Sequence, residues 1–266
     1  MNDLIWGLDV RTEELRSLVL LNGYPVFMPA DEEPCIAGLK LNPWIVEGTN
    51  ELRIRLGPVR DGERLPVTAN FKAEVFRTPH GVERDDDSYL LRFEWDRDEH
   101  KLDEDGMTVV LSHLFEVPTG QAFGRWAWQD AIPFDPGQRV AIELLVGKCR
   151  QALVDRDPDA LVALLSLQLA ELGQALDVPP DLLEQKLRDH LEPFLAADGW
   201  EVAPIDYGVV SLVPAADGRI VLVVGRQGMP VLHGIIATDD EQEEEPPPFL
   251  MELAVSNLDH CWTVVR

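Results

Sequence analysis

Residues 157–176 read DPDALVALLSLQLAELGQAL and carry the helical pattern from which the organisation of the chain can be worked out. Asp157 offers a side-chain acceptor for the free N–H groups at a helix start, and Pro158 suits the first helical position. A helix that is apolar over most of its circumference belongs in an interior. The stretch therefore predicts one deeply buried helix. Its apolar positions recur at helical spacing: Leu161, Leu164, Leu165, Leu169, Leu172 and Leu176.

Two more helices are predicted beside this one, which gives a helical block over about 138–198. Apolar residues recur at helical spacing from Val140 to Leu153. After the break at Val178-Pro179-Pro180, Asp181 can cap a third helix. Pro193 should kink or split that third helix, because proline removes an internal hydrogen bond. The apolar face of the third helix consists of Leu183, Leu187, Leu191 and Phe194.

Short apolar runs separated by glycine-containing turns follow the helical block as far as Arg266. Ala216-Asp217-Gly218 precedes the apolar run 220–224, and Gln227-Gly228 precedes the run 231–237. Such short connections favour antiparallel neighbours over parallel crossovers. Three amphipathic helices need a surface on which to bury their apolar faces. We therefore expect helices (about 138–198) and an antiparallel sheet (about 200–266) to form one α+β domain, residues 136–266.

The element order of residues 138–266 resembles that of the NTF2-like cone domains, as does the tryptophan-bearing terminal run Cys261-Trp262-Thr263-Val264-Val265-Arg266. The resemblance implies helices that close the open side of a curved sheet, often around a pocket. The chain departs from the pattern, since all its helices precede the sheet, whereas an NTF2-like domain usually places a strand between them. The Asp/His pairs of NTF2-like isomerases and dehydratases have no counterpart here, so no catalytic residue is carried over.

The first half of the chain is rich in strand and turn signals. Asn22-Gly23 lies between two apolar runs and predicts a hairpin, because both residues tolerate positive φ. Residues 51–56, ELRIRL, alternate strictly between charged and apolar, as a half-buried strand does. Five or more such strands indicate an antiparallel β-sandwich or barrel over residues 1–135. The turn Phe134-Asp135-Pro136-Gly137 marks its end. Further strands are predicted over 70–76, 89–95 and 107–117.

The chain is strongly acidic, with 23 Lys and Arg against 48 Asp and Glu and a formal net charge of -25. Residues 1–134 contain 14 bases and 25 acids, and residues 135–266 contain 9 and 23, so both halves share the excess. Such a surface repels nucleic-acid phosphates and anionic membranes. It attracts a basic protein or a cationic ligand. The alternative is that the acidity serves solubility alone.

Cysteine usage and hydropathy predict a cytoplasmic protein. The three cysteines, Cys35, Cys149 and Cys261, are far apart and form no Cys-x-x-Cys pair, which indicates a reducing compartment. The N-terminal residues MNDLIWGLDV lack the basic region and apolar run of a secretory signal. No apolar run reaches the roughly 18 residues that a membrane span needs. The oligomeric state stays open.

Two segments are candidate binding surfaces. Trp126 and Trp128 are predicted on one face of a strand. There they would either stack a sugar or cation, or lie in the core or between the domains. Residues 239–248, DDEQEEEPPP, cannot bury apolar surface and predict an extended loop. That loop either contacts a basic partner or is a solvated insertion between strands. Its carboxylates are Asp239, Asp240, Glu241, Glu243, Glu244 and Glu245.

Sequence motifs for catalysis, nucleotides and metals are missing. The chain contains no Gly-x-Gly-x-x-Gly, Walker A, His-Glu-x-x-His or Gly-x-Ser-x-Gly sequence. Its six histidines show no ligand spacing, and the acidic runs 85–87 and 96–105 do not fit an EF-hand. We therefore predict no cofactor and no metal.

The leading hypothesis is a non-enzymatic, acidic cytoplasmic protein that binds a basic partner protein. An immunity protein or inhibitor of a basic toxin would fit, as would an assembly adaptor. The alternative is a small-molecule-binding protein, or an isomerase- or hydrolase-like enzyme, with its pocket in the C-terminal cone. His233, Asp206 and Tyr207 are the first candidates for such a pocket. A third hypothesis is carbohydrate binding through Trp126 and Trp128.

Overall fold

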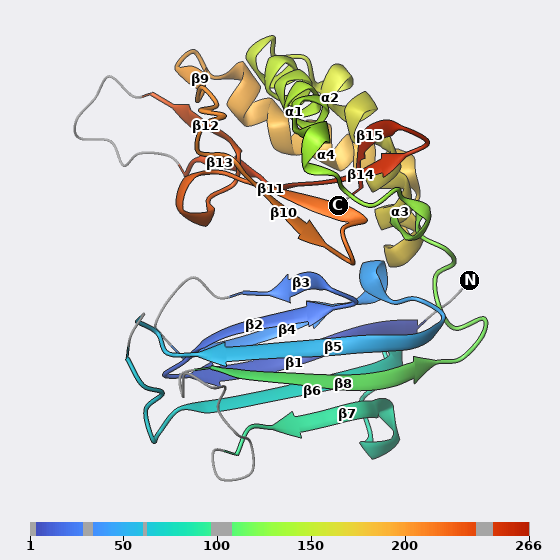
Figure 1. The fold of residues 1–266 in the computed structure, drawn as a ribbon. Helices are drawn as coiled ribbons and strands as arrows, with labels where there is room; N and C mark the ends of the chain where they lie inside the picture. Colours follow the sequence, from blue (N-terminus) through green and yellow to red (C-terminus); the bar gives the residue numbers. More distant parts are fainter. Residues whose placement is uncertain (1–3, 29–33, 61–62, 97–107, 238–246, 266) are drawn as a thin grey trace. The chain divides into compact units, whose positions relative to one another are not determined.

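The computed structural model describes residues 4–28, 34–60, 63–96, 108–237 and 247–265 (Figure 1). These residues form a mixed α+β protein with several antiparallel sheets and four α-helices. The chain divides into two compact units, residues 1–125 and 126–266. All four of these helices lie in the second unit.

The first unit contains two four-stranded antiparallel sheets, with the strand orders β4-β1-β6-β7 and β3-β2-β5-β8 (Figure 1). The strands of the first sheet are β1 (Leu4–Glu13), β4 (Cys35–Lys40), β6 (Asn70–Pro79) and β7 (Tyr89–Glu94). Those of the second sheet are β2 (Arg16–Leu21), β3 (Tyr24–Phe27), β5 (Gly48–Gly57) and β8 (Val109–Val117). Alternate residues of β5 are buried, as in a sheet with one face on a core: Leu52, Ile54 and Leu56.

The predicted hairpin and strands of this unit are confirmed. Strands β2 and β3 flank Asn22 and Gly23, which have φ values of 52° and 79°. The Asn22 side chain also donates to the Asn50 Oδ1 at 2.8 Å, which ties the turn to β5. Strands β5, β6, β7 and β8 cover the other four predicted stretches. Strands β1 and β4 were not predicted.

The helix predicted over 157–176 is two helices in the structure, α2 (Pro158–Leu164) and α3 (Ser166–Leu176). They are bent by 70° at Leu165. A stretch that is apolar on most sides buries more of its surface when it bends, and Leu161, Leu165 and Leu169 are all buried. The predicted cap is confirmed, since the Asp157 Oδ1 accepts from the Ala160 N–H at 2.9 Å.

The other two helices are α1 (Arg139–Val154) and α4 (Pro180–Ala196). One detail predicted for α4 is wrong. Asp181 lies inside the first turn, and Pro179 occupies the cap position. Pro193 does not split the helix, which continues to Ala196, because a proline in the last turn removes only one of its hydrogen bonds; the kink stays a prediction.

Two antiparallel sheets follow the helices, with the orders β10-β11-β14-β15 and β13-β12-β9 (Figure 1). Only Glu252 separates β13 from β14, so one stretch of chain contributes to both sheets. Six of these seven strands lie over predicted apolar runs, with β13 and β14 sharing one run, and β9 was not predicted. The strands are β9 (Trp200–Val202), β10 (Ser211–Ala215), β11 (Ile220–Val224), β12 (Leu232–Ile236), β13 (Phe249–Met251), β14 (Leu253–Leu258) and β15 (Cys261–Val264).

Trp200 joins the helices to the sheets of the second unit. Its ring packs 5.8 Å from the ring of Phe194 on α4 and 6.0 Å from that of Phe249 on β13. Its indole N–H donates to the Leu153 carbonyl near the end of α1, at 3.2 Å. Gly234 on β12 provides the space, because a Cβ atom there would overlap the six-membered ring of Trp200. One apolar core therefore connects α1, α4, β12 and β13.

The segment that opens the second unit differs from its prediction. Trp126 and Trp128 do not lie on a strand, since Ala127–Asp130 form a 3-10 helix. The Ala127 N–H donates to the Glu171 carboxylate on α3 at 2.6 Å. The Ile132 N–H donates to the Asn257 carbonyl on β14 at 2.9 Å. These contacts explain why the compact units divide at residues 125–126, whereas the predicted boundary lay at 135–136.

By length and apolar composition, no single α-helix in the part of the chain that the structure describes would cross a membrane; α2 and α3 pass that test only as a bent pair.

Cys149 and Cys261 should differ sharply in their reactivity toward thiol reagents. Burial raises the pKa of Cys149 to about 11, and its side chain is fully buried, whereas Cys261 is exposed. Because the thiolate is the reactive form, a disulfide reagent at neutral pH should modify Cys261 in the native protein and Cys149 only after unfolding. Mass spectrometry of the modified peptides would check this. Equal modification rates at the two sites under native conditions would contradict the packing of α1.

Candidate functional site

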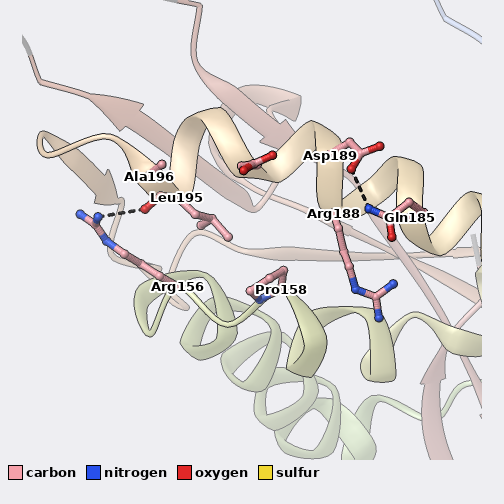
Figure 2. Close-up of a pocket in the computed structure, with 8 residues that line it drawn as sticks. Arg156, Pro158, Gln185, Arg188, Asp189, Leu195 and Ala196 are labelled. Carbon is pink, nitrogen blue, oxygen red and sulfur yellow. Dashed lines mark hydrogen bonds between the residues drawn. The ribbon is translucent and has the colours of Figure 1, made fainter.

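A groove with a volume of about 440 Å³ lies between α4 and the turn that joins α1 to α2 (Figure 2). One wall is the turn, which contributes Arg156 and Pro158. The other wall is a single face of α4, because its residues follow the i, i+3, i+4, i+7 spacing. These residues are Gln185, Arg188, Asp189, Glu192, Leu195 and Ala196.

The turn wall is held in an unusual backbone conformation. Helix α1 ends at Val154, and Arg156 adopts a φ of 55°, the left-handed region that favours glycine. The side chain of Arg156 has a role that glycine could not fill, since its Nη1 donates to the Leu195 carbonyl at 2.9 Å. Trp200 supports the same turn, because its indole N–H and the Arg156 N–H both donate to the Leu153 carbonyl.

Two arginines cross the groove in opposite directions, one from each wall (Figure 2). Arg156 reaches from the turn to α4. Arg188 reaches from α4 to α2, where its Nε donates to the Asp159 Oδ1 at 2.8 Å. Its Nη1 also lies 3.6 Å from the Glu184 Oε2. The hydrogen bond with Asp159 raises the pKa of Arg188. The charge of Arg188 is thus already neutralised within the protein.

The acidic side chains of the groove are not neutralised in this way. The Asp189 Oδ1 accepts from the Gln185 Nε2 at 2.7 Å, which is a bond to a neutral group. Within the described part of the chain, neither Asp189 nor Glu192 forms an ion pair. Beside them lie the apolar surfaces of Pro158, Leu195 and Ala196. A long cationic side chain matches such a lining, because its stem is apolar and its end is charged.

The three residues predicted for an enzymatic pocket have separate positions. His233 is exposed on β12. Asp206 is exposed, and its Oδ1 accepts from the Gly208 N–H at 3.0 Å within a turn. Tyr207 is half-buried and donates to the Glu143 carbonyl on α1 at 3.2 Å, and burial raises its pKa. No hydrogen bond or ion pair joins the three side chains among the residues with described positions.

Of the predicted binding residues, the structure describes Trp126 and Trp128. Trp126 and Trp128 are 0% and 5% exposed, so neither indole offers a ring face to a sugar or a cation in the structure. The acidic carboxylates of the predicted loop lie outside the described residues: Asp239, Asp240, Glu241, Glu243, Glu244 and Glu245.

Sequence reasoning missed Glu171, a buried carboxylate on α3. It accepts the Ala127 N–H and so attaches the first segment of the second unit to the helical layer. The signal was present in the sequence, because Glu171 is the only acidic residue between Ala160 and Leu176 in an otherwise apolar stretch. A charged side chain at such a position is buried only when it has a partner.

Metal ligands do not gather among the described residues, since no three His, Cys, Asp or Glu side chains come together there. Comparison of the chain with protein-family models, curated proteins and solved structures finds no match.

Proposed function

We propose that this chain is a protein-binding module that recognises a basic partner protein, in the manner of an inhibitor, an immunity protein or an assembly adaptor. The observation that supports this most directly is the net charge of -25, to which both halves of the chain contribute. A charge of this size attracts an oppositely charged protein over several ångströms before contact and raises its association rate. We place this activity in the cytoplasm, because the described chain contains three free cysteines and no disulfide.

Exposed carboxylates in the structure support the proposal. In the first unit, Asp85, Asp86 and Asp87 are exposed in a short loop before β7. In the second unit, Asp181, Asp189 and Glu192 are exposed along α4. Exposed carboxylates are accessible to a partner, although the Asp86 Oδ1 already accepts from the Arg92 Nη2 at 2.8 Å.

We also propose a finer reading of the two units. The first unit would be a β-sandwich, since the Phe93 ring on β7 packs 4.8 Å from the His113 ring on β8 of the other sheet. The second would be a cone of the NTF2-like kind, with α1–α4 against the two sheets that share the stretch 249–258. Apolar side chains pack where an enclosed pocket would lie, among them Leu161, Val223, Leu253 and Val255, so we do not propose an enzyme there.

Affinity capture from the native cell tests the proposal. The full chain should enrich a basic protein at low salt and release it at high salt, because exposed charges are screened within about 10 Å at 0.1 M salt. The captured protein, once purified, should bind the chain again without other components. Absence of an enriched protein, or a partner that is neither basic nor sensitive to salt, would contradict the proposed function.

A further inference from the structure

Strand β8 leaves one edge of its sheet open. It is the last strand in the order β3-β2-β5-β8, and β5 is the only strand that pairs with it among the residues that the structure describes. An open edge presents a row of backbone N–H and C=O groups with which another strand can pair. With nine residues, β8 is longer than β3, β4 and β7, the other strands at the edges of the two sheets in the first unit.

The register shows which backbone groups of β8 face this edge. In an antiparallel sheet, the backbone groups of successive residues point to opposite neighbouring strands. The Asn22 N–H donates to the Glu51 carbonyl at 2.9 Å, so the backbone of Glu51 bonds toward β2 and that of Leu52 toward β8. Leu52 is paired with His113, whose backbone groups therefore point back to β5. The residues whose backbone groups point away from β5 alternate with His113: Val110, Ser112 and Leu114.

The side chains along this edge are exposed and carry little charge. Val110 and Leu114 are 59% and 67% exposed, although both are apolar. Glu116 is the only acidic residue of β8, in a chain that has 48. Proteins normally protect open edges with charged side chains or proline. The centre of β8 has neither, whereas β3 contains Pro25 and β7 contains Arg92.

A second copy of β8 is complementary to this edge. If the two strands pair antiparallel about Ser112, Val110 of each copy lies opposite Leu114 of the other. The three outward-facing residues of each strand then exchange about six backbone hydrogen bonds with the second copy. The Glu116 side chains of the two copies lie at opposite ends of the paired segment, so these like charges do not meet. An axis at His113 would instead place Val110 opposite Glu116.

We propose that the chain forms a homodimer through β8, in which two copies of the sheet β3-β2-β5-β8 join across a two-fold axis at Ser112. Each copy contributes the same residues to such an interface. The interface is narrow, so the dimer should be weak and should exchange with the monomer at roughly micromolar concentrations. This inference goes beyond the proposed function and does not depend on it.

The net charge of -25 opposes this association, because both copies carry it. Salt screens that repulsion and should therefore strengthen the dimer. Binding of a basic partner should respond to salt in the opposite direction. A strand from a basic partner would also find no carboxylate at the centre of the β8 edge, which is why a second copy fits this edge better.

Sedimentation velocity of the full chain at about 5 to 500 µM protein tests the inference. In about 0.5 M salt, the unmodified chain should pass from monomer to dimer over that range. Ser112→Lys places two like charges opposite each other at the axis and should weaken the dimer by about tenfold or more. Ile36→Lys makes the same change of charge at an exposed residue of the edge strand β4. This control should change the dissociation constant by no more than about twofold.

A mixture of two variants tests the position of the axis. Ser112→Lys and Ser112→Glu chains should each stay monomeric alone, because like charges meet at the axis. Mixed in equal amounts, they should form a heterodimer, because opposite charges then face each other. Recovery of the dimer in the mixture would also show that both variants are folded.

Four results would overturn the inference. The unmodified chain could stay monomeric at about 500 µM in high salt. Ser112→Lys could weaken the dimer no more than Ile36→Lys does, which would place the contact elsewhere. The mixture could fail to associate, which would contradict the axis at Ser112. Finally, Ser112→Lys could abolish binding of a purified basic partner to a monomeric chain, and the edge would then accept a foreign strand. Salt-sensitive capture of a basic partner would survive the first three results, so failure of the dimer and failure of the proposed function can be distinguished.

Discussion

Replacement of Trp200 by alanine is expected to lower the free energy of unfolding by about 3–5 kcal/mol, the usual range for a large aromatic residue in a core. Trp200 is only 7% exposed, and it packs against Phe194 on α4 and Phe249 on β13. Its indole N–H is also bonded to the Leu153 carbonyl. The substitution would therefore leave a cavity and remove the support of the turn that forms one wall of the groove.

Urea unfolding of the full chain would measure this loss. Helical circular dichroism reports on the second unit, because all four described helices lie there. Val213→Ala is a matched control in the same unit, since Val213 is 43% exposed and should contribute little to stability. If Trp200→Ala destabilised the helical signal by less than about 1 kcal/mol, Trp200 would not be the residue that joins helices to sheets.

The second large effect on the free energy of unfolding is expected when Gly234 is replaced by valine. A valine there suits a strand by propensity, yet its Cβ would overlap the six-membered ring of Trp200. Because that ring is enclosed by Phe194 and Phe249, it cannot move aside freely. Gly234→Val should therefore destabilise the protein by about 1–3 kcal/mol, as overpacked core substitutions do.

The neighbouring residue on β12 supplies the comparison. His233→Val introduces the same side chain at an exposed position of the same strand, and its effect should stay within about 0.5 kcal/mol. The same urea unfolding experiment measures both variants. Similar losses at positions 233 and 234 would contradict the contact with Trp200 as the cause, because strand propensity favours valine at both positions.

Local chemistry was enough to predict several elements of this fold. The Asn22-Gly23 turn and the Asp157 cap each depend on residues close in sequence, and both are confirmed. The alternation of residues 51–56 likewise predicted β5, because its pattern reflects one buried face. Propensity and periodicity act over a few residues, so they identify such elements directly.

Elements that depend on distant contacts were predicted poorly. The bend at Leu165 follows from how an all-round apolar stretch is covered by its surroundings. Strand β4 has alternate residues that are only half-buried, and a sequence with so little burial gives a weak pattern. Trp126 and Trp128 alternate as in a strand, but the bond from Ala127 to Glu171, which is 44 residues away, is made from a 3-10 helix.

One wall of the candidate groove could likewise be predicted from local sequence, and the other could not. Its α4 wall could be derived from the spacing of Gln185, Asp189 and Glu192 once the helix was predicted. The opposite wall could not, because the contact between Arg156 and Leu195 spans 39 residues. Which acids stay unpaired also depends on the position of Arg188 in the folded chain. The site can therefore be recognised only in the folded chain, although its residues are of types that are common on protein surfaces.

The association rate constant between the full chain and its purified basic partner, measured as a function of salt, tests the central claim most directly. Electrostatic recognition predicts that this rate constant falls by about tenfold or more between roughly 0.05 and 0.5 M salt, while the dissociation rate constant changes much less. An association rate constant that is independent of salt would contradict the claim that the net charge of -25 recognises the partner.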